Sequence, residues 1–265
     1  MQNLALKKIE YTAIGESLYR VILPNGLRLF LLPKTNFHET YGIMTVNFGS
    51  VDTYFVPRGT KQAIHYPAGI AHFLEHKLFE DEHGQDILQQ FVELGAEGNA
   101  FTSFTKTSYL FSATDNVLES VSLLQSLLGN AYFTEESVQR EQGIIQQEIE
   151  MYQDNPDYRL FFSALANLYP GTALAQDIAG NRESIAEITV EDLDENFETF
   201  YHPSNMSLFL VGNFDLDKTV ATISEQQNSY EIEDEKSAIK RRSLKLSPVV
   251  PTASMRMEVS RPKLA

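Results

Sequence analysis

The segment His72-Phe73-Leu74-Glu75-His76 spaces two histidines and a glutamate so that one helix would carry them side by side. On a helix, residues four positions apart share a face, so His72 and His76 are predicted to point two imidazoles at one metal ion. The order H-x-x-E-H is the inverted form of the H-E-x-x-H zinc motif. Glu75 would then be placed to take a proton from a water that the metal activates. The alternative is a solvated polar face, because short motifs also arise by chance.

The neighbouring residues predict that this segment is a helix with one buried side. Pro67 and Gly69 suit a loop that enters the helix. Apolar residues then recur at helical spacing, namely Ile70, Phe73, Leu74, Leu78 and Phe79. A histidine pair beside such a stripe is partly removed from water, which favours a metal site over a wet surface.

A second helix offers the third ligand that a tetrahedral zinc site needs besides water. Glu141 and Glu148 are about two helical turns apart and share a face with Ile144 and Ile145. Carboxylates on a buried stripe are costly unless they are paired or bound to a metal. We therefore predict Glu148 as the third ligand and Glu141 as a carboxylate that orients a histidine. The alternative for Glu141 is an ion pair with a nearby Lys or Arg.

The rest of the chain predicts a two-layer α+β domain, with a mixed β-sheet packed against helices. Strands are expected at 19–24 and 27–32 around an Asn-Gly turn, at 41–48, as a pair within 101–114, and at 207–213. Helices are expected at 84–94, 116–132, 137–153, 157–168, 189–201 and 215–228.

The composition changes near residue 229, where charges cluster and a Ser-Pro-Thr-rich stretch follows. We predict one domain over residues 1–228 and a linker from 229 onward, with the start of a strand after Met255. From Lys236 to the end there are eight basic residues and a single acid, so the preceding part of the chain carries all the excess of acid.

Composition sets limits on function. A net charge of −15 argues against nucleic-acid binding, which requires a basic face. This charge either attracts basic peptides or simply maintains solubility. The chain has no cysteine, shows no secretory h-region and contains no apolar run long enough to cross a bilayer. We expect a soluble cytoplasmic protein that does not act at a membrane.

Taken together, these segments resemble the M16 family of zinc metallopeptidases, which includes insulinase, pitrilysin and mitochondrial processing peptidase. The inverted motif followed by the Glu141-x6-Glu148 helix carries the resemblance, and Asn99-Ala100-Phe101-Thr102 is similar to the N-A-(Y/F)-T strand of that family. Further matches lie at 169–172, 178–180, 200–206 and 210–213. The amino-acid sequences of these segments are most similar to those of a bacterial cytosolic branch of the family.

The resemblance implies the M16 half-domain fold, also called the LuxS/MPP-like metallohydrolase fold, and a zinc-dependent endopeptidase of the EC 3.4.24 type. It implies one Zn²⁺ per chain on His72, His76 and Glu148, with Glu75 as general base and Glu141 in support. Such enzymes close two similar halves over a peptide or small protein. This chain is similar to the N-terminal half, so residues 229–265 would lead into a second half or meet a partner subunit, and hydrolysis would depend on it.

The strand Asn99, Ala100, Phe101 and Thr102 is expected at the edge of the sheet near the zinc, where an extended peptide can add by main-chain hydrogen bonds. The alternative is ordinary strand and turn chemistry without a substrate role. The side chains of Phe101, Phe104 and Tyr109 are expected in the core rather than in a pocket.

Two other functions are compatible with parts of the sequence. A peptide-binding, non-catalytic partner subunit of an M16-type assembly would share the fold, but such subunits usually lack part of the zinc motif, which is intact here. A metal hydrolase acting on small molecules would not explain the Glu-x6-Glu helix or the Asn99–Thr102 strand.

Overall fold

The structure is a computed structural model that describes residues 5–57, 60–229, 239–241, 245–257, 261 and 263–264. Its frame is a seven-stranded sheet whose strands lie in the order β1-β2-β3-β9-β4-β8-β7. Neighbouring strands are antiparallel except for β3 and β9, which are parallel. The strands are β1 (Lys7–Tyr11), β2 (Glu16–Ile22), β3 (Arg28–Pro33), β4 (Thr40–Val46), β7 (Ala96–Thr102), β8 (Thr107–Ala113) and β9 (Met206–Gly212).

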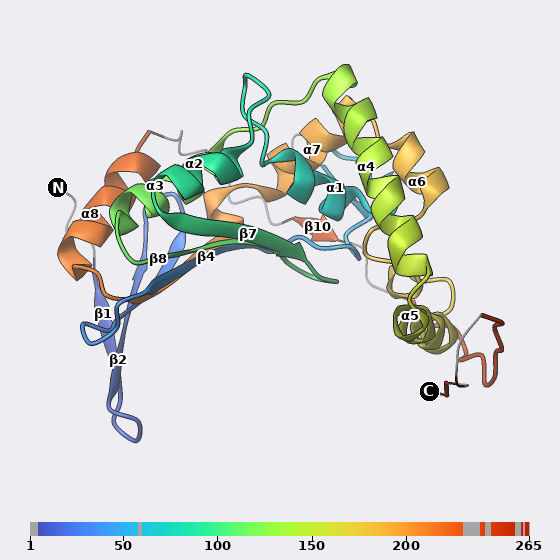
Figure 1. Cartoon of the computed structure of the whole chain (residues 1–265), viewed down its shortest axis with the longest axis horizontal. Helices are drawn as coiled ribbons and strands as arrows, with labels where there is room; N and C mark the ends of the chain where they lie inside the picture. The colour runs from blue at the N-terminus through green and yellow to red at the C-terminus, as the bar shows by residue number, and fades with distance from the viewer. Residues whose placement is uncertain are drawn as a thin grey trace.

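Helices cover one face of this sheet and continue beyond its β7 end, so that the chain forms an arch (Figure 1). They are α1 (Ile70–Lys77), α2 (Ile87–Glu93), α3 (Val117–Gly129), α4 (Glu135–Gln153), α5 (Pro156–Leu168), α6 (Arg182–Glu187), α7 (Val190–Phe200) and α8 (Leu216–Gln227). Two short 3-10 helices, η1 (Ala173–Ala175) and η2 (Pro203–Asn205), lie in loops. No helix in the described residues is both long and apolar enough to span a membrane.

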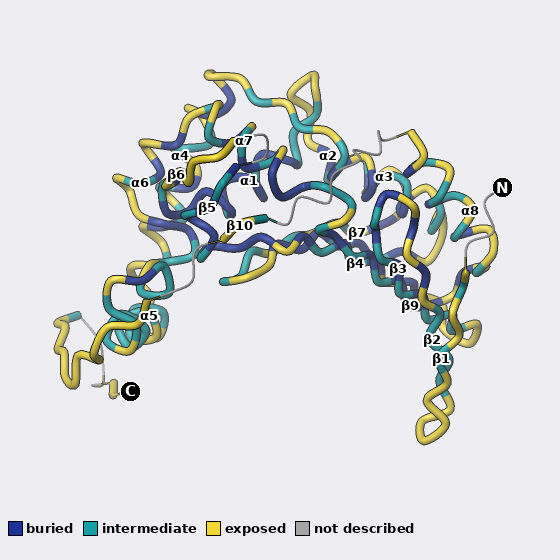
Figure 2. The backbone as a smooth tube through the Cα atoms, turned by 180° about the vertical axis from the view of Figure 1, so that it is seen from behind, coloured by how far each residue is buried: buried dark blue, intermediate teal, exposed yellow. Residues whose placement is uncertain are grey.

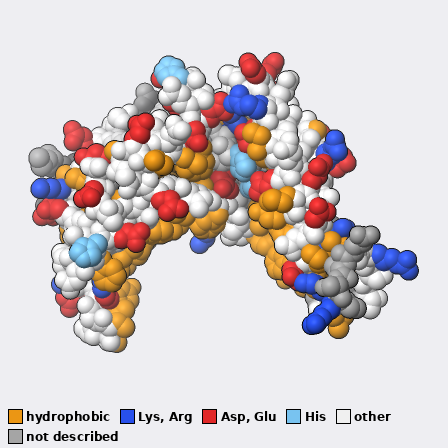
Figure 3. Space-filling view, in the orientation of Figure 1, with side chains coloured by type: hydrophobic (Ala, Val, Ile, Leu, Met, Phe, Trp, Pro, Cys, Tyr) orange, Lys and Arg blue, Asp and Glu red, His pale blue; other side chains and the backbone are white. Residues whose placement is uncertain are grey.

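The two faces of the sheet differ because side chains alternate along a strand. Met44 of β4 and Leu208 and Leu210 of β9 point under the helices and are buried. Their neighbours Ile43 and Phe209 point to the opposite face, where they stay partly exposed. Figure 2 shows buried and intermediate stretches of backbone along the sheet. Apolar side chains line this concave underside in the space-filling view (Figure 3). The predicted two-layer α+β architecture is confirmed.

Most predicted elements are found near the expected residues, including the hairpin of β2 and β3. The strand pair predicted within 101–114 begins earlier, because Ala96 to Asn99 also pair with β8 despite their weak strand propensity. Phe101 was expected in the core, but it is 47% exposed because it lies on the edge strand and faces the uncovered side. Tyr109 is fully buried as expected.

Several elements were missed from the sequence. Strand β1 is rich in charge, and α6 has only six residues, so neither gives a clear periodic signal. A three-stranded sheet of β10 (Lys240–Arg241), β5 (Tyr54–Val56) and β6 (Ile64–His65) joins short segments from distant parts of the chain. Residues 245–257 have no regular structure, and most of the strand predicted after Met255 lies outside the described residues.

Strand β10 pairs with β5, and its Arg241 forms an ion pair with a buried carboxylate. The Asp52 carboxylate is 7% exposed, accepts a hydrogen bond from the Gly49 amide at 3.0 Å, and pairs with Arg241 Nε at 2.6 Å. The Arg241 guanidinium also lies 5.2 Å from the ring centroid of Phe200. Burial raises the pKa of Asp52, and Arg241 opposes this rise. The cation therefore stabilises a carboxylate that water does not reach.

Replacing Arg241 with Met is expected to lower the free energy of unfolding by about 2 kcal/mol at neutral pH, since it leaves the Asp52 charge buried without its cation. The loss should shrink as the pH falls towards the raised pKa of Asp52, because a neutral acid needs no cation. Urea unfolding at several pH values measures this. Lys240→Met, at an exposed neighbour, is the control, and an equal loss in both variants would contradict the role of the ion pair.

Candidate metal centre

The start of helix α1 is fixed by two glycines that let two loops touch. Gly69, at the helix N-cap, has φ 92°, and a Cβ there would lie 2.5 Å from the Ala179 carbonyl oxygen. Gly180 has φ 78°, and its Cβ would lie 2.4 Å from the Ala68 carbonyl oxygen. The Ser184 hydroxyl donates to that same oxygen at 2.8 Å. This close approach sets where α1 begins, and therefore where its side chains point.

Helix α1 divides its residues between the core and the site. Its apolar side is fully packed, with the following side chains at most 1% exposed: Ile70, Ala71, Phe73, Leu74 and, just beyond the helix, Leu78. His72 and His76 lie one turn apart on the other side, with ring centroids 4.5 Å apart. The predicted shared face of the two imidazoles is therefore present.

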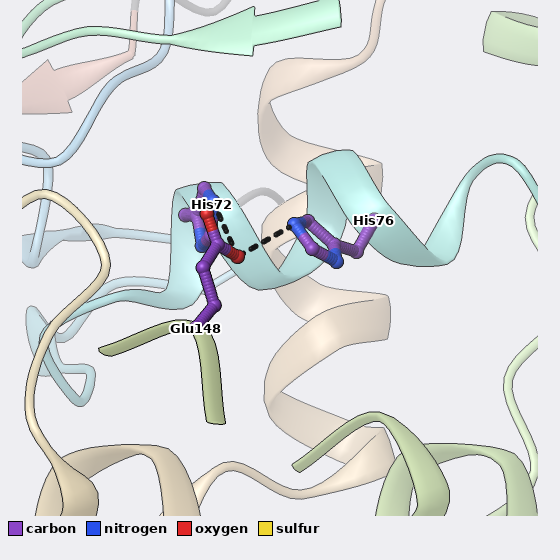
Figure 4. Close-up of side chains that lie close together, drawn as sticks. All are labelled: His72, His76 and Glu148. Carbon is purple, nitrogen blue, oxygen red and sulfur yellow. Dashed lines mark ion pairs between the residues drawn. The ribbon is translucent and has the colours of Figure 1, made fainter. Parts of the chain in front are cut away.

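Helix α4 lies opposite α1 and supplies carboxylates. Thr134 caps its first turn by accepting a hydrogen bond from the Ser137 amide at 3.1 Å. Glu148 Oε2 lies 3.7 Å from His72 Nε2 and 3.4 Å from His76 Nε2 (Figure 4). The buried stripe is narrower than expected, because Ile145 is buried whereas Ile144 is 47% exposed.

Glu141 contacts the second histidine. Its Oε1 lies 2.9 Å from His76 Nδ1, the ring nitrogen that does not face Glu148. The pair holds the imidazole ring at a fixed angle, which is the usual role of a carboxylate behind a metal-binding histidine. His72 differs, because its Nδ1 is buried without a hydrogen-bond partner among the described residues.

The three facing atoms fit a tetrahedral metal ion. One ligand atom each from His72, His76 and Glu148 lies within 4.8 Å of the other two. Two ligands about 2.0–2.1 Å from a tetrahedral zinc lie roughly 3.4 Å apart, close to the 3.4 and 3.7 Å found between Glu148 and the histidines. Two imidazoles and one carboxylate are also a known donor set for catalytic zinc.

Burial and neighbouring charges shift the pKa values of the two histidines in opposite directions. Burial lowers the pKa of His72 to about 3, and the nearby His76 adds to this. Burial also acts to lower the pKa of His76, but Glu141, Glu148 and Glu75 together raise it. His72 is therefore a neutral imidazole, which is the form that binds metals. The pKa of His76 instead depends on the carboxylates beside it.

Glu75 lies beside this group, and its carboxylate meets strand β7. Its side chain is 8% exposed, and Oε2 accepts a hydrogen bond from the Thr102 hydroxyl. Burial raises the pKa of Glu75, opposed by the bond from Thr102 and by His76. A carboxylate with a raised pKa accepts a proton more readily, as general-base catalysis near neutral pH requires.

Strand β7 brings the other predicted site residues to the same place, at the edge of the sheet. A pocket of about 380 Å³ includes Glu75, His76, Asn99 and Ala100 in its lining. Thr102 meets Glu75 directly, whereas Phe101 points to the uncovered face of the sheet. The free edge of β7 thus runs past the histidine motif.

No sequence pattern indicates one charged contact that lies next to the site. Lys77 is 1% exposed, and its ammonium pairs with Glu80. Glu80 also pairs with Arg140 of α4 at 2.7 Å. These three residues tie the end of α1 to the helix that carries Glu141 and Glu148. A lysine within an apolar run is normally expected at the surface, so only the fold reveals this pairing.

The fold and the inverted motif place the chain in the class of peptidases built on this α+β half-domain. The sequence profile of insulinase (peptidase family M16) matches residues 54–182, and that of the peptidase M16 inactive domain matches residues 187–261. The chain belongs to the M16 peptidase family.

Individual proteins similar to this chain agree with its membership of the M16 peptidase family. The uncharacterized zinc protease YmfH of Bacillus subtilis is 46% identical over 97% of this chain and 60% of its own length. An M16-like peptidase from Alicyclobacillus acidocaldarius has a TM-score of 0.79 and 37% identity, covering 91% of this chain and 53% of that one. The first half of the periplasmic protease PqqL of Escherichia coli shares the fold, with a TM-score of 0.72 at 23% identity over 87% of this chain and 49% of that one.

The chain therefore spans 60% of the curated relative and about half of the solved structures that it matches. The PqqL structure named above is itself the first half of a larger protease, and this chain covers 25% of the structure of that protease as a whole. The cytoplasmic location and the boundary between residues 228 and 229 stay predictions.

Proposed function

We propose that this chain is the N-terminal, catalytic half of a zinc-dependent endopeptidase. The observation that carries the proposal is the convergence of His72, His76 and Glu148 at distances that suit one tetrahedral zinc, next to the buried carboxylate of Glu75. The names of relatives as zinc proteases support the peptidase class. One Zn²⁺ per chain would bind at this point.

Each residue has a defined part in hydrolysis. Zinc, when bound, polarises the scissile carbonyl and activates a water molecule. Glu75 takes the proton of the attacking water and passes it to the leaving amine nitrogen. Glu141 keeps the His76 ring in its ligand orientation through the 2.9 Å contact. Burial around His72 keeps it neutral and available as a ligand.

The substrate in this proposal is an extended peptide or small protein. Strand β7 is the last strand of the sheet, and a peptide strand that added to it along Asn99 to Thr102 would pass the pocket at Glu75 and His76. Such a peptide would compete with the Asn99 side chain for the Ala100 amide, which it now binds at 2.8 Å. Main-chain pairing grips a backbone without requiring one sequence. A C-terminal half or a partner subunit of the same family would close over the bound peptide, since the relatives are longer than this chain.

A second candidate is a peptide-binding subunit that does not cleave. The match of residues 187–261 to the peptidase M16 inactive domain is the observation in its favour. The complete set of His72, Glu75, His76 and Glu148 favours the catalytic proposal instead.

Elemental analysis of bound metal tests the proposal. We expect about one zinc per chain after zinc is offered and the excess is removed. We also expect the chain joined to its C-terminal half to hydrolyse a quenched-fluorescent random decapeptide library. Absence of bound zinc both in this chain alone and in the chain joined to its C-terminal half would contradict the proposal. Zinc binding and peptide binding without hydrolysis in the joined protein would favour the non-catalytic subunit.

A further inference from the structure

Thr102 was expected to bind substrate, but its hydroxyl is already engaged inside the protein. Thr102 Oγ1 lies within hydrogen-bond distance of Glu75 Oε2, and at 3.4 Å from Thr107 Oγ1. Thr107 is fully buried, and its hydroxyl donates to the Phe48 carbonyl oxygen at 2.9 Å. The hydroxyl of Thr102 therefore lies between the Thr107 hydroxyl and the carboxylate of Glu75.

The direction of these bonds follows from counting protons. A threonine hydroxyl has one proton to donate. Thr107 gives its proton to the Phe48 carbonyl, which only accepts, so Thr107 can only accept from Thr102. An ionised carboxylate also only accepts, and its bond from a hydroxyl is stronger than a neutral one. Thr102 therefore donates its one proton to Glu75 rather than to Thr107, whose oxygen lies 3.4 Å away.

We propose that Thr102 is a positioning residue that holds Oε2 of Glu75 and leaves Oε1 as the oxygen that takes the proton of the attacking water. This inference rests on the proposed peptidase function. A carboxylate in a pocket can rotate about its last bond, and misplacement of a reacting group by about 1 Å can cost about 10²-fold in rate. The hydrogen bond from Thr102 restricts that rotation, and it is the one side-chain hydrogen bond to Glu75 among residues 5–57 and 60–229.

The position of Thr102 also connects substrate binding with catalysis. It is the last residue of β7, the edge strand that would pair with a peptide. A peptide that adds to β7 would lie beside the strand whose side chain holds the general base. The structure thus assigns Thr102 a role in turnover rather than in affinity.

The test compares Thr102→Val, which keeps the shape but loses the hydroxyl, with Thr102→Ser, which keeps the hydroxyl. Both are made in the protein joined to its C-terminal half and are assayed on the peptide that the wild type cleaves best from the random decapeptide library. We expect Thr102→Val to lower kcat by roughly 10- to 100-fold with KM and zinc content unchanged. Thr102→Ser should stay within about threefold of the wild type, as the retained hydroxyl implies.

Thr45→Val is the matched control. It removes one hydroxyl of a similar pair, with Ser108 at 2.9 Å, on the uncovered face of the sheet. It should leave kcat unchanged. A second readout is binding of the same peptide, labelled with fluorescein, in the Glu75→Gln background, where Thr102→Val should not change the dissociation constant.

The outcomes separate this inference from the proposed function. Full kcat in Thr102→Val, an equal loss in Thr102→Ser, or weaker peptide binding or zinc loss in Thr102→Val would overturn the positioning role. If Glu75→Gln itself keeps full turnover, the proposed general base is wrong whatever Thr102 does. Loss in Glu75→Gln together with full activity in Thr102→Val would reject only the inference about Thr102.

Discussion

Replacing Glu75 with Gln in the protein joined to its C-terminal half is expected to lower kcat for peptide hydrolysis by about 10²–10⁴-fold, the usual contribution of a general base. The amide has nearly the same size as the carboxylate, so the packing of this 8% exposed side chain should persist. An amide cannot take the proton of the attacking water. Zinc content should stay at about one per chain, because His72, His76 and Glu148 are untouched.

The control for this variant is Glu82→Gln, the same chemical change at a 59% exposed side chain in the loop after α1. Its activity should match that of the wild type. The measurements are initial rates on the selected decapeptide and zinc per chain by elemental analysis. Turnover of Glu75→Gln at the wild-type rate would rule out the general-base role. Loss of zinc in the same variant would mean that Glu75 contributes to metal binding instead.

The sequence was sufficient to predict the fold class and most elements because the apolar period is strong in them. The residues buried in α1 recur at helical spacing, and in β4 and β9 buried positions alternate with less buried ones. The same logic fails for β1, with its charged residues, and for the two-residue strand β10, since pairing with a distant partner rather than local propensity defines them. Ile144 shows the limit within a helix, because its exposure depends on what packs against α4.

The features of the candidate site also divide into those that local sequence patterns predict and those that depend on the fold. Fixed spacing on single helices was enough to group His72 with His76 and Glu141 with Glu148, but not to show that α1 and α4 face each other. The bond from Thr102 to Glu75 crosses from a strand to a helix, so no local pattern indicates it. Its only signal was the place of Thr102 within the Asn99–Thr102 segment, which was assigned to substrate instead.

Zinc affinity should fall in a fixed order when the glutamates of α4 are replaced one at a time by Gln. Glu141→Gln should weaken zinc binding by about 10- to 100-fold, the usual cost of losing the group that orients a metal-binding histidine. Glu148→Gln should weaken it further, because it removes a charged ligand that faces both histidines at 3.4 and 3.7 Å. Competition of each variant with a chromogenic zinc chelator measures the dissociation constants.

Glu150→Gln supplies the matched control, because Glu150 is on the same helix but is 64% exposed and pairs only loosely with Arg182, at 3.7 Å. Its zinc affinity should equal that of the wild type. Equal losses of zinc affinity in Glu141→Gln and Glu148→Gln would have one of two meanings. Either both carboxylates bind the ion directly, or neither does and the affinity falls because α4 carries one negative charge less. The Glu150 variant separates these cases, since a general effect of charge on α4 would appear there as well. Only the graded order, with Glu148 most affected and Glu150 unaffected, fits one ion held by His72, His76 and Glu148.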